Sequence, residues 1–119
     1  MNDTNLLDAL LENSDIKVFF KDLNGKHIKI SKALLADAAG CNENDIVGKT
    51  NNELYSNEIS REITAHDNEI ISSKETKLFT EKIEFNNCIY LNKVFKFPVF
   101  NSKNEVIGTG GIVKEPKKQ

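Results

Sequence analysis

The stretch IKVFFKDLNGKHIKIS, residues 16–31, carries the clearest local fold signal in the chain. Residues 16–21 are mostly apolar and β-forming, and a strand-like alternation resumes over residues 27–30. Between them stands Asn24-Gly25, a dipeptide that favours the two-residue type I′ turn because both of its central positions take a positive φ. The stretch therefore predicts a β-hairpin.

The chain after this hairpin is expected to form short helices. Ser31 is a suitable N-cap for a helix that stops at Gly40 and carries an apolar set, namely Ala33, Leu34, Leu35, Ala38 and Ala39. A one-turn helix follows from Asn42 to Gly48, and Thr50 with Glu53 offers a capping box for another turn.

A longer helix is predicted over residues 57–73, with Ile59, Ile63 and Ile70 at helical spacing and His66 on the same stripe. Three segments beyond it, residues 77–85, 89–99 and 105–113, alternate apolar and polar side chains. Two strands, a helical middle and three hairpin-linked strands can share one antiparallel sheet with helices on one face. The expected fold class is therefore α+β.

An amphipathic helix is expected at the start of the chain, beginning near Asp3 or Asn5. Its apolar stripe consists of four leucines, Leu6, Leu7, Leu10 and Leu11. This stripe needs a partner, which is either the sheet of the same chain or a second copy. We expect a flanking helix over residues 1–14, one domain over residues 15–114 and a solvated tail over residues 115–119.

Composition narrows the function classes. The 119 residues suit one domain, and 39% hydrophobic with 29% charged residues is typical of a globular protein. Sixteen basic residues against 18 acidic ones argue against a general nucleic-acid or anionic-membrane binder. No apolar run is long enough to span a membrane, so a cytoplasmic segment is expected. Cys41 and Cys88 have no ligand spacing for a metal and are expected to be reduced and unreactive.

Five short motifs at the joints of these elements resemble the PAS family. They are Phe20–Gly25 (FKDLNG), Gly40–Thr50 (GCNENDIVGKT), His66–Ile71 (HDNEII), Phe97–Val99 (FPV) and Asn104–Gly108 (NEVIG). Each motif alone is weak, but their order is more specific, and the resemblance as a whole covers about residues 4–114. The resemblance implies a five-stranded antiparallel sheet in order 2-1-5-4-3, with helices closing a pocket over one face. Ser31 replaces the usual asparagine, and the family's usual ending is absent, so the link to an output domain is undefined.

The resemblance also implies candidate site residues. The pocket candidates are apolar, namely Phe19, Ile30, Leu34, Ile63, Ile70, Phe79, Phe95 and Phe97, and a filled core is the alternative. His66 could be an axial ligand of haem, because haem-binding members carry their ligand on this helix. The reactive-cysteine segment of flavin-binding members is absent. The leucine stripe at Leu6, Leu7, Leu10 and Leu11 is the candidate dimer interface.

We therefore expect a sensory and regulatory module of a larger signalling protein, in two-component or transcription regulation, that binds a small ligand or a partner and is not an enzyme. The two imidazoles are His66 and His27, which follows the hairpin turn and is expected to be exposed, and no nucleophilic triad is evident. The glycines at 108, 110 and 111 lie in a strand pattern, which favours close backbone packing over a phosphate loop. A haem-based gas or redox sensor using His66 and a ligand-free dimerisation scaffold are the alternatives, with a small enzyme more distant.

Overall fold

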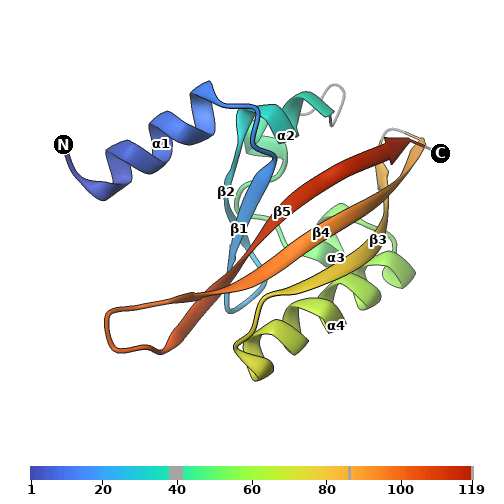
Figure 1. The fold of residues 1–119 in the computed structure, drawn as a ribbon. Coiled ribbons are helices and arrows are strands. Elements are labelled where there is room, and N and C mark those ends of the chain that lie inside the picture. The colour runs from blue at the N-terminus through green and yellow to red at the C-terminus, as the bar shows by residue number, and fades with distance from the viewer. Residues whose placement is uncertain (38–41, 86, 119) are drawn as a thin grey trace.

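The structure, a computed structural model, describes residues 1–37, 42–85 and 87–118. Its elements follow the predicted order (Figure 1). The helices and the single 3-10 turn are α1 (Asp3–Asn13), α2 (Lys32–Asp37), η1 (Glu43–Asp45), α3 (Asn51–Leu54) and α4 (Asn57–Ser73). The strands are β1 (Val18–Asp22), β2 (His27–Ile30), β3 (Lys77–Phe85), β4 (Cys88–Phe100) and β5 (Val106–Lys118).

The five strands form one antiparallel sheet in the order β2-β1-β5-β4-β3, which confirms the expected α+β fold and strand order. The first and last strands of the chain pair at its centre, where Phe19 lies opposite Gly111 and Lys21 opposite Thr109. A Cβ at Gly111 would overlap the Phe19 ring, so the glycine leaves space for that side chain. The close packing expected of these glycines is present.

The helices α2, α3 and α4 lie on one face of the sheet, while α1 projects away from its edge (Figure 1). Local caps explain where several helices begin. The Ser31 hydroxyl accepts from the backbone N–H of Leu34 at 3.3 Å, and Ser56 caps α4 by accepting from Ile59 N. Thr50 and Glu53 form the predicted capping box. The bounds predicted for the long helix, residues 57–73, are confirmed.

Strand β5 continues to Lys118, beyond the boundary at residue 114 that the sequence suggested. The expected solvated tail over residues 115–118 is therefore wrong for the backbone. Pairing with β1 ends at Ile112, so the last part of β5 has β4 as its neighbour on one side. The register shifts between Leu91 and Lys93 of β4, which leaves two residues of β5, including Pro116, opposite one residue of β4. Proline is tolerated at such a bulge because it has no N–H to donate.

The core lies between the sheet and α4 and includes Ile59, Ile63 and Ile70 from the helix with Val94 and Val113 from the sheet. The predicted helix end at Ala38, Ala39 and Gly40, together with Cys41, lies outside the described residues. Cys88 is a half-buried free thiol. Within residues 1–37, 42–85 and 87–118, no helix combines the length and hydrophobicity that crossing a bilayer requires.

Candidate functional site

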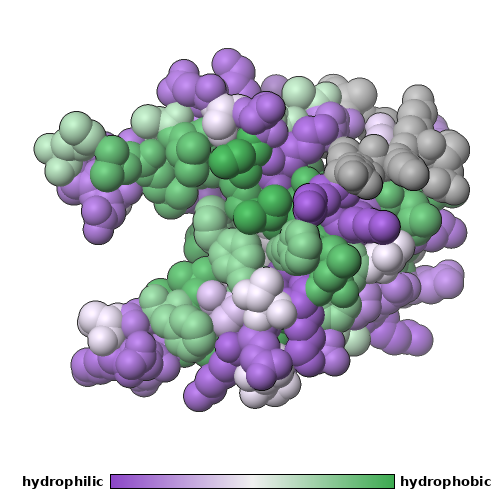
Figure 2. Space-filling model, in the orientation of Figure 1, coloured by the Kyte–Doolittle hydropathy of each residue, from purple (hydrophilic) through white to green (hydrophobic). Residues whose placement is uncertain are grey.

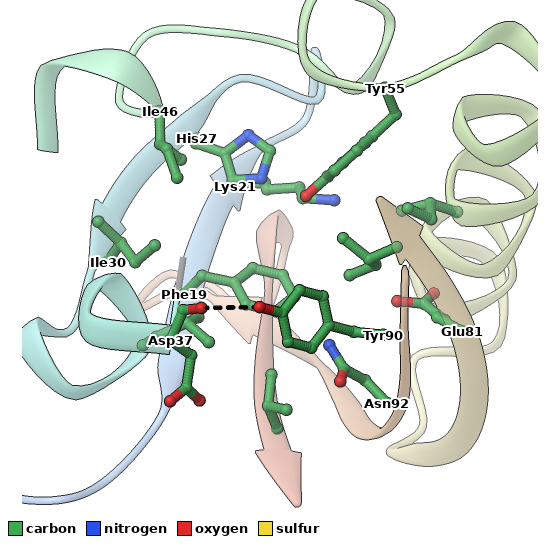
Figure 3. Close-up of a pocket in the computed structure, with 14 residues that line it drawn as sticks. Phe19, Lys21, His27, Ile30, Asp37, Ile46, Tyr55, Glu81, Tyr90 and Asn92 are labelled. Atoms are coloured by element: carbon green, nitrogen blue, oxygen red, sulfur yellow. Dashed lines mark hydrogen bonds between the residues drawn. The ribbon is translucent and has the colours of Figure 1, made fainter. Parts of the chain in front are cut away.

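A cavity lies between the sheet and the helical segment, at the end nearest α2 and η1 (Figure 3). Its volume is about 70 Å³. Its lining is apolar for the most part, with Phe19, Ile30, Leu34, Ile46, Ile63, Ile83 and Val113. Its polar and aromatic lining residues are Lys21, His27, Asp37, Tyr55, Glu81, Tyr90 and Asn92.

Four of the eight pocket residues suggested by the sequence line this cavity, namely Phe19, Ile30, Leu34 and Ile63. The other four do not appear in its lining. Ile70 is a fully buried residue of α4, and Phe79 stacks on His66 with ring centroids 4.1 Å apart.

Phe95 and Phe97 lie on the opposite face of the sheet. Side chains alternate along a strand, and the cavity face of β4 carries Tyr90, Asn92, Val94 and Lys96. Phe97 instead meets Phe20 edge to face, at 6.1 Å between centroids. The aromatic residues of β4 that the sequence suggested for the pocket therefore belong to the outer face.

His66 points toward β3 and does not appear in the cavity lining. Its Nδ1 lies 2.8 Å from Glu81 Oε2, and one face of its ring is covered by Phe79. On α4, Asp67 is the more buried neighbour of His66, and its carboxylate faces the sheet. The buried, sheet-facing side of α4 therefore includes the polar residue Asp67 as well as isoleucines, which the sequence did not predict.

A cluster of buried charges joins α4 to three strands. Lys96 Nζ lies 2.6 Å from Asp67 Oδ1 and 2.7 Å from Glu81 Oε2, and Lys21 Nζ lies 2.9 Å from Asp67 Oδ2. Lys21 also donates to Asn51 Oδ1 at 3.0 Å, which adds α3 to the cluster. We call these four charged residues, Lys21, Asp67, Glu81 and Lys96, the charge cluster. Two cations face two carboxylates, so its formal charges balance.

Burial and pairing act in opposite directions within the charge cluster. Burial lowers the pKa of Lys21, and the charge of Asp67 opposes this only in part. Burial would raise the pKa of Asp67, but Lys21 and Lys96 outweigh that effect and hold the pKa below its usual value. Asp67 therefore stays ionised in the folded protein and stabilises both lysines.

His27 is 5% exposed, although its place after a hairpin turn had suggested an exposed residue. That expectation is wrong because η1 and the segment after it cover the ring, and Nδ1 lies 2.8 Å from the carbonyl oxygen of Lys49. Burial, with a smaller effect of Lys21, lowers the pKa of His27 to about 4. A carbonyl only accepts hydrogen bonds, so the neutral ring carries its proton on Nδ1 and leaves Nε2 as an acceptor.

Sequence reasoning missed the polar lining residues Lys21, His27, Glu81, Tyr90 and Asn92. A usable signal was present in the strands, because Glu81 shares its alternation with Phe79 and Ile83, and Asn92 and Lys96 share theirs with Val94. Polar residues in phase with the inward positions of a strand indicate a buried polar site. Lys21 also borders a second, polar cavity of about 190 Å³ with Asn51, Thr64 and Asp67.

The outer face of the sheet and α1 form an apolar, hollowed surface between α1 and the β4–β5 hairpin (Figure 2). The predicted stripe of α1 is only partly covered, since Leu11 is buried while Leu6 and Leu10 are 55% and 46% exposed. Leu7 is half-buried. Asp8 pairs with Lys29 of β2 at 2.8 Å, which ties the helix to the sheet edge.

Solved structures with the same fold share little sequence with this chain. A PAS domain from Colwellia psychrerythraea has a TM-score of 0.78 at 14% identity, with 95% of this chain and 96% of that one covered. The VqmA–ligand–DNA complex of Vibrio cholera has a TM-score of 0.77 at 15% identity, with 96% of this chain and 51% of that one covered. The LOV protein of Rhodobacter sphaeroides has a TM-score of 0.76 at 14% identity, with 93% and 65% covered.

A search of curated proteins found no match. The family model for the PAS fold, in contrast, matches residues 11–117, which include all the cavity-lining residues and the whole sheet except Lys118 at the end of β5. PAS domains are sensory and regulatory modules rather than enzymes. The motifs, the strand order and this match agree, and the chain belongs to the PAS fold family.

Proposed function

We propose that this chain is a sensory and regulatory module that binds a small molecule in the cavity beside β3 and β4 and performs no catalysis itself. The observation that carries the proposal is the cavity of about 70 Å³ on the helix-covered face of the sheet. Its wall combines apolar side chains with a few buried polar groups, which is the usual composition of a ligand site. Two similar structures are of VqmA, one with ligand and DNA and one bound to DPO, so a ligand-bound protein of this fold has precedent.

The charge cluster supplies a route from the cavity to α4. Glu81 lines the cavity, and its Oε2 contacts both Lys96 and His66, while Lys96 contacts Asp67. A ligand that changes the position or the hydrogen bonding of Glu81 therefore affects His66 of α4 directly. It affects the next residue of α4, Asp67, through Lys96. Our proposal is that such a shift in packing reaches the flanking helix and an output domain of a larger, cytoplasmic protein.

The test of ligand binding is a pair of matched variants. Ile30→Phe adds volume to the cavity wall, whereas Ile28→Phe adds the same volume at a 53% exposed position of the same strand. Native mass spectrometry of the purified chain would detect a retained small molecule. We expect it in the wild type and in Ile28→Phe and not in Ile30→Phe. A ligand retained equally by all three would contradict binding in this cavity.

We propose that a second copy of this chain covers the outer face, which makes the protein a homodimer. Support comes from the leucines of α1 and from the aromatic residues Phe20, Phe95 and Phe97 on that face of the sheet. Exposed apolar patches often mark protein–protein interfaces. The dimerisation role accompanies the ligand-binding role, because the two use opposite faces of the sheet.

The geometry does not fit a haem bound through His66. The cavity volume of about 70 Å³ is far too small for haem. His66 lies outside the cavity lining, with Nδ1 engaged by Glu81 and one ring face covered by Phe79. No step of the proposed function therefore involves haem. The absorption spectrum of the expressed chain tests whether haem binds.

A further inference from the structure

Glu81 and Asn92 form a polar pair in the wall of the cavity. The two residues are directly opposite each other in the β3–β4 register, so their Cβ atoms are expected roughly 5 Å apart on the same face of the sheet. Both line the cavity, and they are 2% and 6% exposed. Figure 3 shows the carboxylate and the amide on adjacent strands at the same side of the cavity.

Both members of the pair have unused hydrogen-bonding capacity. Glu81 uses Oε2 for His66 and Lys96, and no hydrogen bond reaches its Oε1 from the part of the chain that the structure describes. The Oδ1 of Asn92 is buried and has no partner among the same residues. An unpaired buried polar atom costs about 1–3 kcal/mol, and native proteins rarely leave one without a reason. A ligand in the cavity would supply a donor for Glu81 Oε1 and an acceptor for the amide N–H groups of Asn92.

The charges around the cavity are already paired. Lys21 faces Asp67, Glu81 faces Lys96, and Asp37 Oδ2 lies 2.6 Å from Lys17 Nζ. An anionic ligand near the pair would meet the carboxylate of Glu81, and a cationic one would meet Lys21 and Lys96 nearby. Placing an uncompensated ion in such a wall is unfavourable, so an uncharged ligand fits best.

We propose that the cavity binds a small, uncharged ring compound with an N–H beside a C=O, such as a lactam. The N–H donates to Glu81 Oε1, and the C=O accepts from Nδ2 of Asn92. The apolar side chains Phe19, Ile63 and Val113 contact the rest of the ring. The cavity volume of about 70 Å³ limits its size to about one substituted ring. This inference rests on the proposed function, because it names the ligand class for the same cavity.

The experiment compares four probe compounds of similar ring size. They are 2-pyridone, which has the N–H and C=O side by side; toluene, which has no polar group; benzoate, an anion; and benzamidine, a cation at neutral pH. Binding is followed by NMR titration of the isotope-labelled δ-methyl groups of Ile30 and Ile63, both in the cavity wall. We expect 2-pyridone to bind most tightly and the two ions not to shift these signals.

Two variants test the contacts. Asn92→Leu keeps the approximate size of the side chain and removes its hydrogen bonds, so 2-pyridone should bind at least about tenfold more weakly while toluene binds as well or better. Glu81→Gln should also weaken 2-pyridone, because a carboxylate accepts a stronger hydrogen bond than an amide. Glu84→Gln, an exposed position on the same strand, is its matched control and should change nothing.

The outcomes separate this inference from the proposed function. Equal 2-pyridone affinity in wild type, Asn92→Leu and Glu81→Gln would overturn the inference, as would benzoate or benzamidine binding as tightly as 2-pyridone. If toluene or an ion binds and 2-pyridone does not, the ligand class is wrong and the cavity remains a ligand site. If none of the four probes binds and no retained molecule is found by native mass spectrometry, the proposed function itself fails.

Discussion

Lys96 Nζ lies 2.6 Å from Asp67 Oδ1, so a fully buried ammonium group of β4 is held by a carboxylate of α4. Lys96→Met keeps a chain of similar length and removes the charge. Asp67 then keeps Lys21 as its ion-pair partner and Glu81 keeps its contact with His66, and removing one partner of a buried ion pair costs about 3–5 kcal/mol. We expect a loss of that order in the free energy of unfolding, measured by urea denaturation. Lys93→Met, at an exposed position on the outer face of the same strand, should change stability little.

The free energy of unfolding should decrease as the pH is lowered, because of His27. Its pKa is lowered to about 4 in the folded chain from an ordinary value of 6.5, so between these values the unfolded chain binds a proton that the folded chain does not. The contribution is thus present above pH 6.5 and is lost as the pH falls toward 4. From pH 7 to pH 5 we expect a loss of about 2 kcal/mol from this residue.

The measurement is urea denaturation of the wild type and His27→Gln at both pH values. The glutamine amide can still donate to the Lys49 carbonyl but does not titrate. The variant should therefore be less sensitive to the change. An equal loss in both proteins would assign the pH dependence to other groups. Asp67 acts in a lower range, because its lowered pKa keeps its contribution until the pH falls below its ordinary value.

Asn92→Leu should raise the thermal stability of the ligand-free chain. The substitution replaces a buried amide whose Oδ1 has no partner with an apolar side chain of similar size. We expect an increase of about 1 kcal/mol in the free energy of unfolding, since the desolvation cost of the amide disappears. A decrease would mean that the amide already makes favourable interactions in the free protein. Stabilisation together with weaker 2-pyridone binding would be typical of a residue kept for binding.

Leu10→Glu should weaken the proposed homodimer. Leu10 is 46% exposed on the stripe of α1, and a charge there would have to be desolvated when two copies meet. Analytical ultracentrifugation over a concentration series measures the dissociation constant directly. Ala9→Glu introduces the same charge at the adjacent exposed position and is the control. A monomeric wild type, or equal effects of both variants, would contradict an interface through the leucine stripe. Leu7→Glu is a second variant that tests the same interface.

The haem hypothesis has a direct spectroscopic test. Expression with a haem precursor should give a chain without a Soret band, because His66 is engaged by Glu81 and the cavity is too small for the macrocycle. A Soret band that His66→Ala removes would contradict this expectation and reinstate the haem sensor.

The elements and their order could be predicted from local sequence. Asn24-Gly25, the Ser31 cap, the capping box at Thr50 and the regular spacing of isoleucines in residues 57–73 depend on near neighbours in the chain. The strand order came from a resemblance, because antiparallel pairing of β1 with β5 joins residues about ninety positions apart and leaves no local signal. The extension of β5 to Lys118 could not be predicted locally, because it depends on pairing with β4 as far as Tyr90.

By itself, then, the sequence determined a single α+β domain with a hairpin, a helical middle and three further strands, since turn and cap chemistry and hydrophobic periodicity act over a few residues. Only the tertiary structure decided that Lys96 meets Asp67 and that Glu81 stands beside Asn92 in the cavity wall. The physical reason is that burial of a charge is favourable only when a partner from another element arrives at the same place. Which inward polar residues pair with each other, and which are left for a ligand, is therefore a property of the assembled sheet and helix.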